Sequence, residues 1–342
     1  MGVLLQALSI NSAPEGSARI AQPGPSSVAQ PDGTPIVARR DERAILGQRC
    51  RMVPLGEIAG DVRSRVSRAL RAARLRRLDR ASGKVQPGHS QSPFPLRWIN
   101  DHTLGVDDLT FTLRTWDFEN LVSRGRDFLL LKDRAFVDEY VRLFSGESVT
   151  RVLEFGVYHG GNMLLMHKGF GASKVVGVDL RPQETALMEY VRQAELTDNV
   201  VPHFYTSQAD RASVTKIIEE DFSGQEIDVV IDDATHDFSL TREAFNIAFP
   251  YLKPGGLYVI EDWGWAHWRD APWQSTLCID QPALSNLVFE LVMACTSSRE
   301  IIARVDVSPY LVAVRKGGAT PERAGFDLSS LYVARGKTLT LL

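Results

Sequence analysis

The sequence has few cysteines, and none lies in a spacing typical of a metal site. Cys50, Cys278 and Cys295 are the three cysteines, and no two of them form a CxxC pair. Cysteines this scarce and unpaired are typical of a reducing compartment and argue against a thiolate zinc site. We therefore expect a cytoplasmic protein whose chemistry does not depend on thiols.

Long apolar runs and a large net charge are also missing. No stretch reaches the length that a membrane-spanning helix needs. The N-terminal run VLLQALSI is short and has no basic residues before it, so we expect no signal peptide. The formal net charge of −3 gives no general attraction to nucleic acid, and we expect no nucleic-acid partner.

Positive charge is nevertheless concentrated near the N-terminus. Residues 1–55 include a segment rich in Pro, Ser, Gly and Ala, which predicts a partly disordered arm. In the arginine-rich stretch that follows, Ile58, Val62, Val66 and Leu70 recur at every fourth position, which indicates a basic amphipathic helix. Such a helix can contact an anionic membrane, but we favour packing on its own domain or on a second subunit of a homo-oligomer.

Residues 56–145 are predicted to form a mostly helical auxiliary region before the main domain. Within it we expect helices around Trp116–Val122 and Ala135–Phe144. Its aromatic residues are expected to pack, and the region could also form one wall of a substrate pocket.

A regular alternation of strands and helices begins at Arg151. We expect seven strands with helices between the first six, and the last two strands follow each other directly as an antiparallel pair. The predicted fold is α/β: a Rossmann-like, seven-stranded, mostly parallel sheet with helices on both faces. We assign it to residues 146–318 and expect a C-terminal tail over 319–342.

The first strand, RVLEFG, leads into a glycine-rich turn, VYHGGN, and the second strand ends at Asp179. Glycine permits unusual backbone angles and the close approach of a ligand. An acid at the end of the second strand is well placed to bind ribose hydroxyls. Asp179 could instead cap a helix that begins near Pro182, but the turn and the acid together favour a nucleoside-containing ligand. Further along, Asp210 could cap the next helix, and Gln208 or Asp210 could lie at the edge of an adenine pocket.

Two acid pairs follow the fourth and fifth strands: Asp232-Asp233 after Ile227–Ile231, and Glu261-Asp262 after Leu257–Ile260. Ligands bind at the carboxyl ends of parallel strands, and clustered carboxylates favour a hard divalent cation such as Mg²⁺. The alternative is that each pair caps the helix after it. His236 is within reach of the first pair.

Tryptophans crowd the loop after Asp262. Trp263 or Trp265 could contribute a flat apolar face to a sugar or macrocycle pocket, or these side chains could simply pack.

These motifs resemble class I S-adenosylmethionine-dependent methyltransferases over roughly residues 150–316. The resemblance rests on E-x-G-x-x-x-G-G, the acid of the second strand, PGG before the fifth strand and the terminal strand pair. The pairing of IDDATH with YLKPGGLYVIEDW is similar to metal-dependent sugar O-methyltransferases of macrolide antibiotic biosynthesis and to the cephalosporin hydroxylase-like group.

The resemblance implies roles for particular residues. Asp179 would hold the ribose, Asp210 would lie near the adenine and His236 would act as the base. The metal-binding acids would be Asp233, Glu261 and Asp262. The other residues at the S-adenosylmethionine site would be Glu154, Gly156, Tyr158, Gly161, Asn162, Gln208 and Asp232.

The implied function is Mg²⁺-dependent methylation of a sugar hydroxyl on a glycosylated natural product or a glycolipid. Two alternatives remain. One keeps the chemistry but uses a phenolic, catecholic or β-lactam acceptor. The other is a non-catalytic cofactor-binding module that docks through the basic helix.

Overall fold

The computed structural model of the chain describes residues 93–115, 122–269, 274 and 281–337. The predicted N-terminal arm and the arginine-rich helix lie outside these residues. So does almost all of the helix expected at Trp116–Val122.

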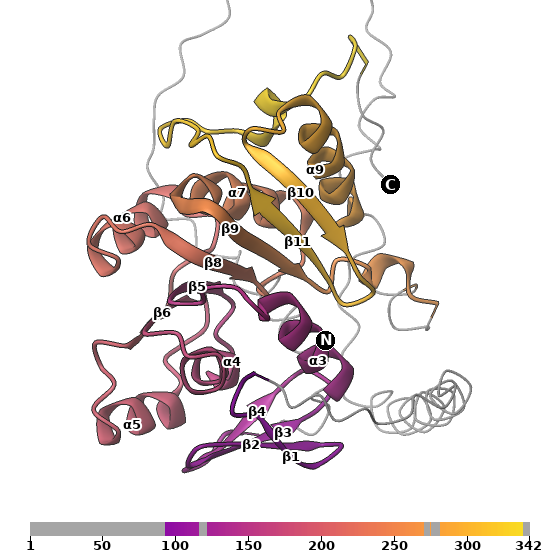
Figure 1. Cartoon of the computed structure of the whole chain (residues 1–342). Helices are drawn as coiled ribbons and strands as arrows, with labels where there is room; N and C mark the ends of the chain where they lie inside the picture. Colours follow the sequence, from indigo (N-terminus) through magenta and orange to yellow (C-terminus); the bar gives the residue numbers. More distant parts are fainter. Residues whose placement is uncertain (1–92, 116–121, 270–273, 275–280, 338–342) are drawn as a thin grey trace, which may run out of the picture. The chain divides into compact units, whose positions relative to one another are not determined.

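A seven-stranded sheet forms the centre of the described part of the chain and confirms the predicted fold (Figure 1). The strand order is β10-β11-β9-β8-β5-β6-β7. Neighbours from β9 to β7 are parallel, whereas β11 is antiparallel to both β9 and β10. The strands are β5 (Arg151–Phe155), β6 (Lys174–Val178), β7 (Val200–His203), β8 (Ile227–Asp232), β9 (Leu252–Glu261), β10 (Ile302–Val307) and β11 (Leu311–Lys316).

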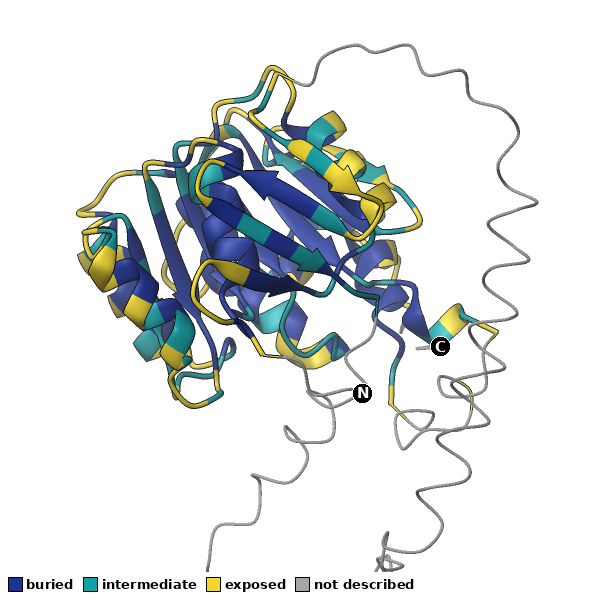
Figure 2. Cartoon of the chain, turned by 90° about the horizontal axis from the view of Figure 1, so that it is seen from below, coloured by how far each residue is buried: buried dark blue, intermediate teal, exposed yellow. Residues whose placement is uncertain are grey.

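Helices cover both faces of this sheet because successive strand residues point to opposite sides. Val152 packs in a core with helices α3, α4 and α5, whereas its neighbour Leu153 packs with α6, α7 and α9. Figure 2 shows the central strands buried and the outer helix surfaces exposed. The helices are α3 (Arg134–Phe144), α4 (Gly161–Leu164), α5 (Thr185–Gln193), α6 (Arg211–Asp221), α7 (Phe238–Ala248) and α9 (Ser285–Ser297). Shorter elements are η1 (Leu165–Gly169), η2 (Phe249–Tyr251), η3 (Trp265–His267) and η4 (Leu328–Leu331).

The prediction of a mostly helical auxiliary region is wrong for the described residues before Arg134. They form a four-stranded sheet of order β1-β2-β3-β4, antiparallel except for the β3–β4 pair. The strands are β1 (Arg97–Asn100), β2 (Thr103–Val106), β3 (Leu109–Leu113) and β4 (Asp127–Leu130). The segment LTFTL carries the alternation of apolar and polar residues that is typical of a strand. In the structure, its three apolar residues are buried and its two threonines are half-buried. The helix expected at Ala135–Phe144 is confirmed as α3.

The small sheet packs directly against the beginning of α4. A Cβ added to Gly161 would lie 2.2 Å from the carbonyl oxygen of Leu129 in β4, so only glycine allows this approach. The side chains of β2, β3 and β4 join the same apolar core as α3 and one face of the large sheet. This packing places the chain that follows β4 next to the large sheet.

Candidate functional site

The turn after β5 brings its backbone against the end of β8. Gly156 has φ +92°, and a Cβ there would lie 2.2 Å from the carbonyl oxygen of Asp233. Any other residue would be both strained and overpacked at this position. The turn therefore keeps the ends of β5 and β8 close together.

Two buried acceptor oxygens at this turn have no partner in the structure. Asn162 donates through Nδ2 to Glu154 Oε1 at 3.1 Å, but Glu154 Oε2 and Asn162 Oδ1 have no donor. Burial raises the pKa of Glu154 to about 8, with Lys132 and the Asn162 hydrogen bond opposing the rise. A ligand with N–H donors would satisfy both oxygens.

Asp179 lies just after β6 and holds the glycine turn through main-chain contacts. Its carboxylate accepts from the backbone N–H of Tyr158 at 2.8 Å and of Arg181 at 2.7 Å. The alternative of a helix cap is wrong, because α5 begins at Thr185 with Glu184 as its N-cap. A carboxylate can accept about four hydrogen bonds, so Asp179 can still accept from a ligand hydroxyl.

Gln208, Asp210 and Asp232 differ in their surroundings. Asp210 is the exposed N-cap of α6, where it accepts from the backbone N–H of Ser213, which confirms the predicted cap. Gln208 is buried and donates to Asp232 Oδ1 at 3.4 Å. Tyr258 donates to the other oxygen of Asp232, and burial raises the pKa of Asp232 to about 7.

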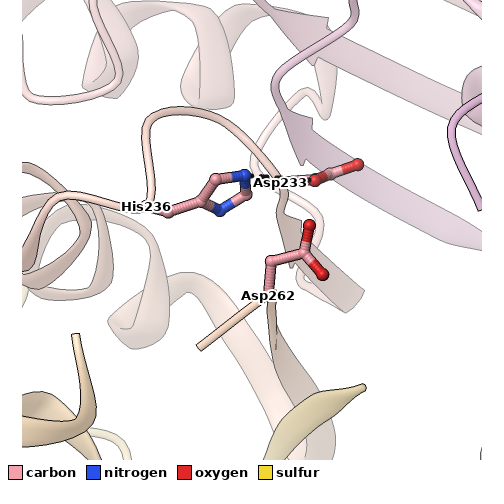
Figure 3. Close-up of side chains that lie close together, drawn as sticks. All are labelled: Asp233, His236 and Asp262. Carbon is pink, nitrogen blue, oxygen red and sulfur yellow. Dashed lines mark ion pairs between the residues drawn. The ribbon is translucent and has the colours of Figure 1, made fainter. Parts of the chain in front are cut away.

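Asp233, His236 and Asp262 come together at the ends of β8 and β9 (Figure 3). Each offers one potential ligand atom, and these atoms all lie within 4.8 Å of one another. His236 and Asp262 have φ values of +54° and +51°, a costly conformation that clusters at functional sites. Burial raises the pKa of Asp262, and His236 opposes the rise.

These acids do not cap the elements that follow them, so that alternative is wrong. Asp237 is the N-cap of α7 and accepts from the backbone N–H of Leu240. Gly264 precedes η3 and has no capping side chain.

Glu261 lies apart from this three-residue cluster and contacts two residues that the sequence analysis did not single out. Its Oε2 accepts from Lys132 Nζ at 2.5 Å, and its Oε1 accepts from the Tyr140 hydroxyl. Lys132 also donates to Asp233 Oδ2 at 2.8 Å. Burial disfavours the Lys132 ammonium, yet attraction to Asp233 and Glu261 raises its pKa. Burial and the neighbouring Asp233 raise the pKa of Glu261, with Lys132 opposing the rise.

The positive charge that clustered carboxylates require is thus supplied in part by the chain itself. Lys132 and Tyr140 come from the segment before Arg151. The only available sequence signal was that Lys132 closes an otherwise apolar run, FLLLK. Nothing in the spacing of these residues indicated that they meet Glu261.

The two tryptophans considered as pocket residues make packing contacts. Trp263 donates through Nε1 to the carbonyl oxygen of Ser308 at 2.8 Å. Trp265 is 5% exposed and donates to the carbonyl oxygen of His236 at 3.1 Å. Trp265 therefore supports the backbone that carries His236.

Comparison with known proteins identifies the domain that carries the site. Residues 153–263 match a family model described as a methyltransferase domain. The chain is 30% identical over 138 residues to demethylmacrocin O-methyltransferase of Streptomyces fradiae, a match covering 38% of this chain and 31% of that protein. It is 29% identical over 141 residues to an 8-demethyl-8-alpha-L-rhamnosyl tetracenomycin-C 2'-O-methyltransferase of Streptomyces olivaceus. That match covers 39% of this chain and 34% of that protein. The chain thus spans about a third of the length of the curated relatives it matches.

A solved structure of MycE methyltransferase in complex with Mg, SAH and mycinamycin VI is also similar. It is 25% identical, the similarity covers 53% of this chain and 49% of that one, and the TM-score is 0.41. The strand order, the domain match and the curated relatives lead to one conclusion. Residues 153–263 are similar to a methyltransferase domain, and the chain resembles class I S-adenosylmethionine-dependent O-methyltransferases.

Proposed function

We propose that this protein is an S-adenosylmethionine-dependent O-methyltransferase. Its acceptor would be a sugar hydroxyl on a glycosylated natural product or a glycolipid. The metal that it requires would be Mg²⁺. The names of two similar curated proteins support this acceptor class, since they describe O-methyltransferases of a rhamnosyl tetracenomycin and of an olivosyl-oleandolide.

One observation carries the cofactor assignment: the unpartnered Glu154 Oε2 and Asn162 Oδ1 beside the glycine turn. S-adenosylmethionine carries an ammonium group that can donate to both oxygens and a sulfonium charge that favours a nearby carboxylate. Its ribose hydroxyls would donate to Asp179, whose carboxylate keeps acceptor capacity. Gln208 and Asp232 would line the same site, and Asp210 would lie near the adenine.

The donor set at the ends of β8 and β9 fits a hard divalent cation. Carboxylate oxygens are the ligands that Mg²⁺ prefers, and Asp233 and Asp262 offer theirs within one small cluster. We propose that Asp233, Glu261 and Asp262 hold the cation. When bound, the metal would supply positive charge that makes a coordinated hydroxyl easier to deprotonate.

His236 would act as the general base at this site. Its Nε2 lies 3.9 Å from Asp233 Oδ1, so the imidazole faces the carboxylates. It would accept the proton of the acceptor hydroxyl as the new oxygen–carbon bond forms and the methyl–sulfur bond breaks. The products would be the methyl ether and S-adenosylhomocysteine, with the proton on His236.

The cofactor assignment is tested by calorimetric titration with S-adenosylhomocysteine. We expect binding by the wild type and at least tenfold weaker binding by Asp179→Asn, because hydrogen bonds to a charged group contribute about 1.5–3 kcal/mol. Asp306→Asn is the control, since Asp306 pairs with Arg304 on the edge strand β10, whereas Asp179 follows β6 near the opposite edge of the sheet. Equal affinity in all three proteins would contradict the assignment.

The acceptor class is tested with a panel of glycosylated macrolides, glycolipids, catechols and β-lactams. We expect methyl transfer from S-adenosylmethionine to a glycoside, with loss of transfer in EDTA and recovery with added Mg²⁺. Transfer only to a catechol or β-lactam would replace the proposed acceptor. Transfer that is unaffected by EDTA would remove the metal from the proposal.

A further inference from the structure

Lys132 and Tyr140 are buried charged and polar residues that the proposed mechanism does not use. The Lys132 side chain is 3% exposed and Tyr140 is fully buried. Lys132 follows β4 and Tyr140 lies on α3, so both belong to the segment before the methyltransferase domain. They nevertheless reach across 129 and 121 sequence positions, respectively, to Glu261.

Aromatic packing fixes the position of both groups. The Lys132 ammonium lies 4.9 Å from the ring centre of Phe136. The Tyr140 ring packs edge-on against Phe136 and Phe170, at centroid distances of 5.5 Å and 6.0 Å, and tilted against Phe144 at 5.3 Å. The tyrosine hydroxyl is thus held toward Glu261.

The oxygens of the two acids have different roles in this arrangement. Both oxygens of Glu261 accept a hydrogen bond, one from Lys132 and one from Tyr140. Asp233 Oδ2 accepts a hydrogen bond from Lys132 Nζ, whereas Asp233 Oδ1 faces His236 Nε2 at 3.9 Å. Asp233 is also 24% exposed at its side chain, whereas Glu261 is 1% exposed.

A purely structural ion pair is a poor explanation for this cluster. Buried ion pairs cost several kcal/mol in desolvation per ion, and apolar side chains of equal volume often stabilise a fold as well or better. Hydrogen bonds that orient metal-binding carboxylates are a known way to tune a metal site. Here each of the two donors restricts a carboxylate at the proposed cation site.

We propose that Lys132 and Tyr140 are positioning residues of the metal site. They hold both oxygens of Glu261 and Oδ2 of Asp233, and so determine how these carboxylates face a divalent cation. This inference rests on the proposed function, and it makes the auxiliary segment of the same chain a functional part of the site.

The test is calorimetric titration with Mn²⁺, supported by electron paramagnetic resonance of the free ion. Tyr140→Phe removes one hydrogen bond to Glu261 while keeping the ring, and Lys132→Arg keeps the charge but changes its reach and shape. We expect each variant to bind Mn²⁺ about 10–100-fold more weakly, the usual effect of losing an outer-shell partner. Affinity for S-adenosylhomocysteine should stay within twofold, because the hydrogen bonds of both residues go to Asp233 and Glu261, and Lys132→Arg keeps the positive charge near Glu154.

Tyr190→Phe is the matched control. Tyr190 belongs to the same apolar core, but its hydroxyl donates to Asp108, away from the acids, so Mn²⁺ affinity should not change. Circular dichroism checks folding, and Lys132→Arg carries the test if Tyr140→Phe does not fold. Unchanged Mn²⁺ affinity in the folded variants would overturn the inference. A wild type that binds no Mn²⁺ would instead overturn the proposed metal site itself.

Discussion

At the scale of single residues, the site depends on backbone positions that tolerate few side chains. Gly156 is the sharpest case, because its positive φ and its contact with the Asp233 carbonyl act together. His236 and Asp262 also have positive φ although they carry side chains. Surrounding contacts must hold these two residues in place, among them the hydrogen bond from Trp265 to the His236 carbonyl.

We predict that Gly156→Ala lowers the free energy of unfolding more than Gly171→Ala does. Gly171 has φ +79° but open space where a Cβ would lie, so alanine there costs only the backbone strain of about 1–3 kcal/mol. At Gly156 an overpacking cost of about 1–3 kcal/mol is added. Urea unfolding of both variants measures the difference, and equal losses would contradict the prediction.

At the scale of elements, Asp179, Asp233 and Asp262 each lie directly after a strand, and Asp210 lies directly before a helix. Asp210 is a case in which two roles overlap. It caps α6 in the structure, and we propose that it also lies near the adenine.

We predict that Asp210→Ala lowers stability by about 1 kcal/mol, because α6 loses its N-cap. Asp210→Ser should restore most of that stability, since serine caps as well as aspartate. Affinity for S-adenosylhomocysteine separates the two roles. If Asp210 contacts the adenine, binding stays weakened in the serine variant, whereas full recovery with serine would leave Asp210 as a cap alone.

At the scale of the whole described molecule, an ion-pair network ties the C-terminal segment to the helices. Arg242 of α7 donates to Glu290 of α9 at 2.8 Å and to both oxygens of Asp327, the N-cap of η4. Asn246 adds contacts to the same segment. Among all the residues that the structure describes, no helix is long and apolar enough to cross a membrane.

The network predicts a pH dependence of stability. Hydrogen bonds from Arg242 lower the pKa of Asp327 to about 2, below its ordinary value of 3.8. Folding therefore favours the ionised carboxylate, and this contribution is present above pH 4 and is lost as the pH falls toward 2. Because Asp327 is 45% exposed, we expect at most about 1 kcal/mol.

Urea unfolding of the wild type and Asp327→Asn at several pH values provides the measurement. The two proteins should differ near neutral pH and converge between pH 4 and pH 2. If the difference in the free energy of unfolding stays constant from pH 4 to pH 2, the ionised Asp327 carboxylate is not the source of the pH dependence.

The sequence alone determined the large sheet and its order of strands and helices. Short β-branched runs, glycine turns and the final strand pair are local signals, so they could be recognised without tertiary structure. The same holds for Asp233, His236 and Asp262, because residues at the carboxyl ends of neighbouring parallel strands must meet at one edge.

Only the tertiary structure decided how the acids are neutralised and what lies before the sheet. Lys132 and Tyr140 reach Glu261 because β4 and α3 pack on the large sheet, and no local pattern encodes such distant contacts. The alternation in LTFTL was a local signal, but its five residues also sit beside aromatic and charged residues that suggested helices. The hydrogen bonds of Glu261 therefore join two segments whose contact depends on burial in a common core.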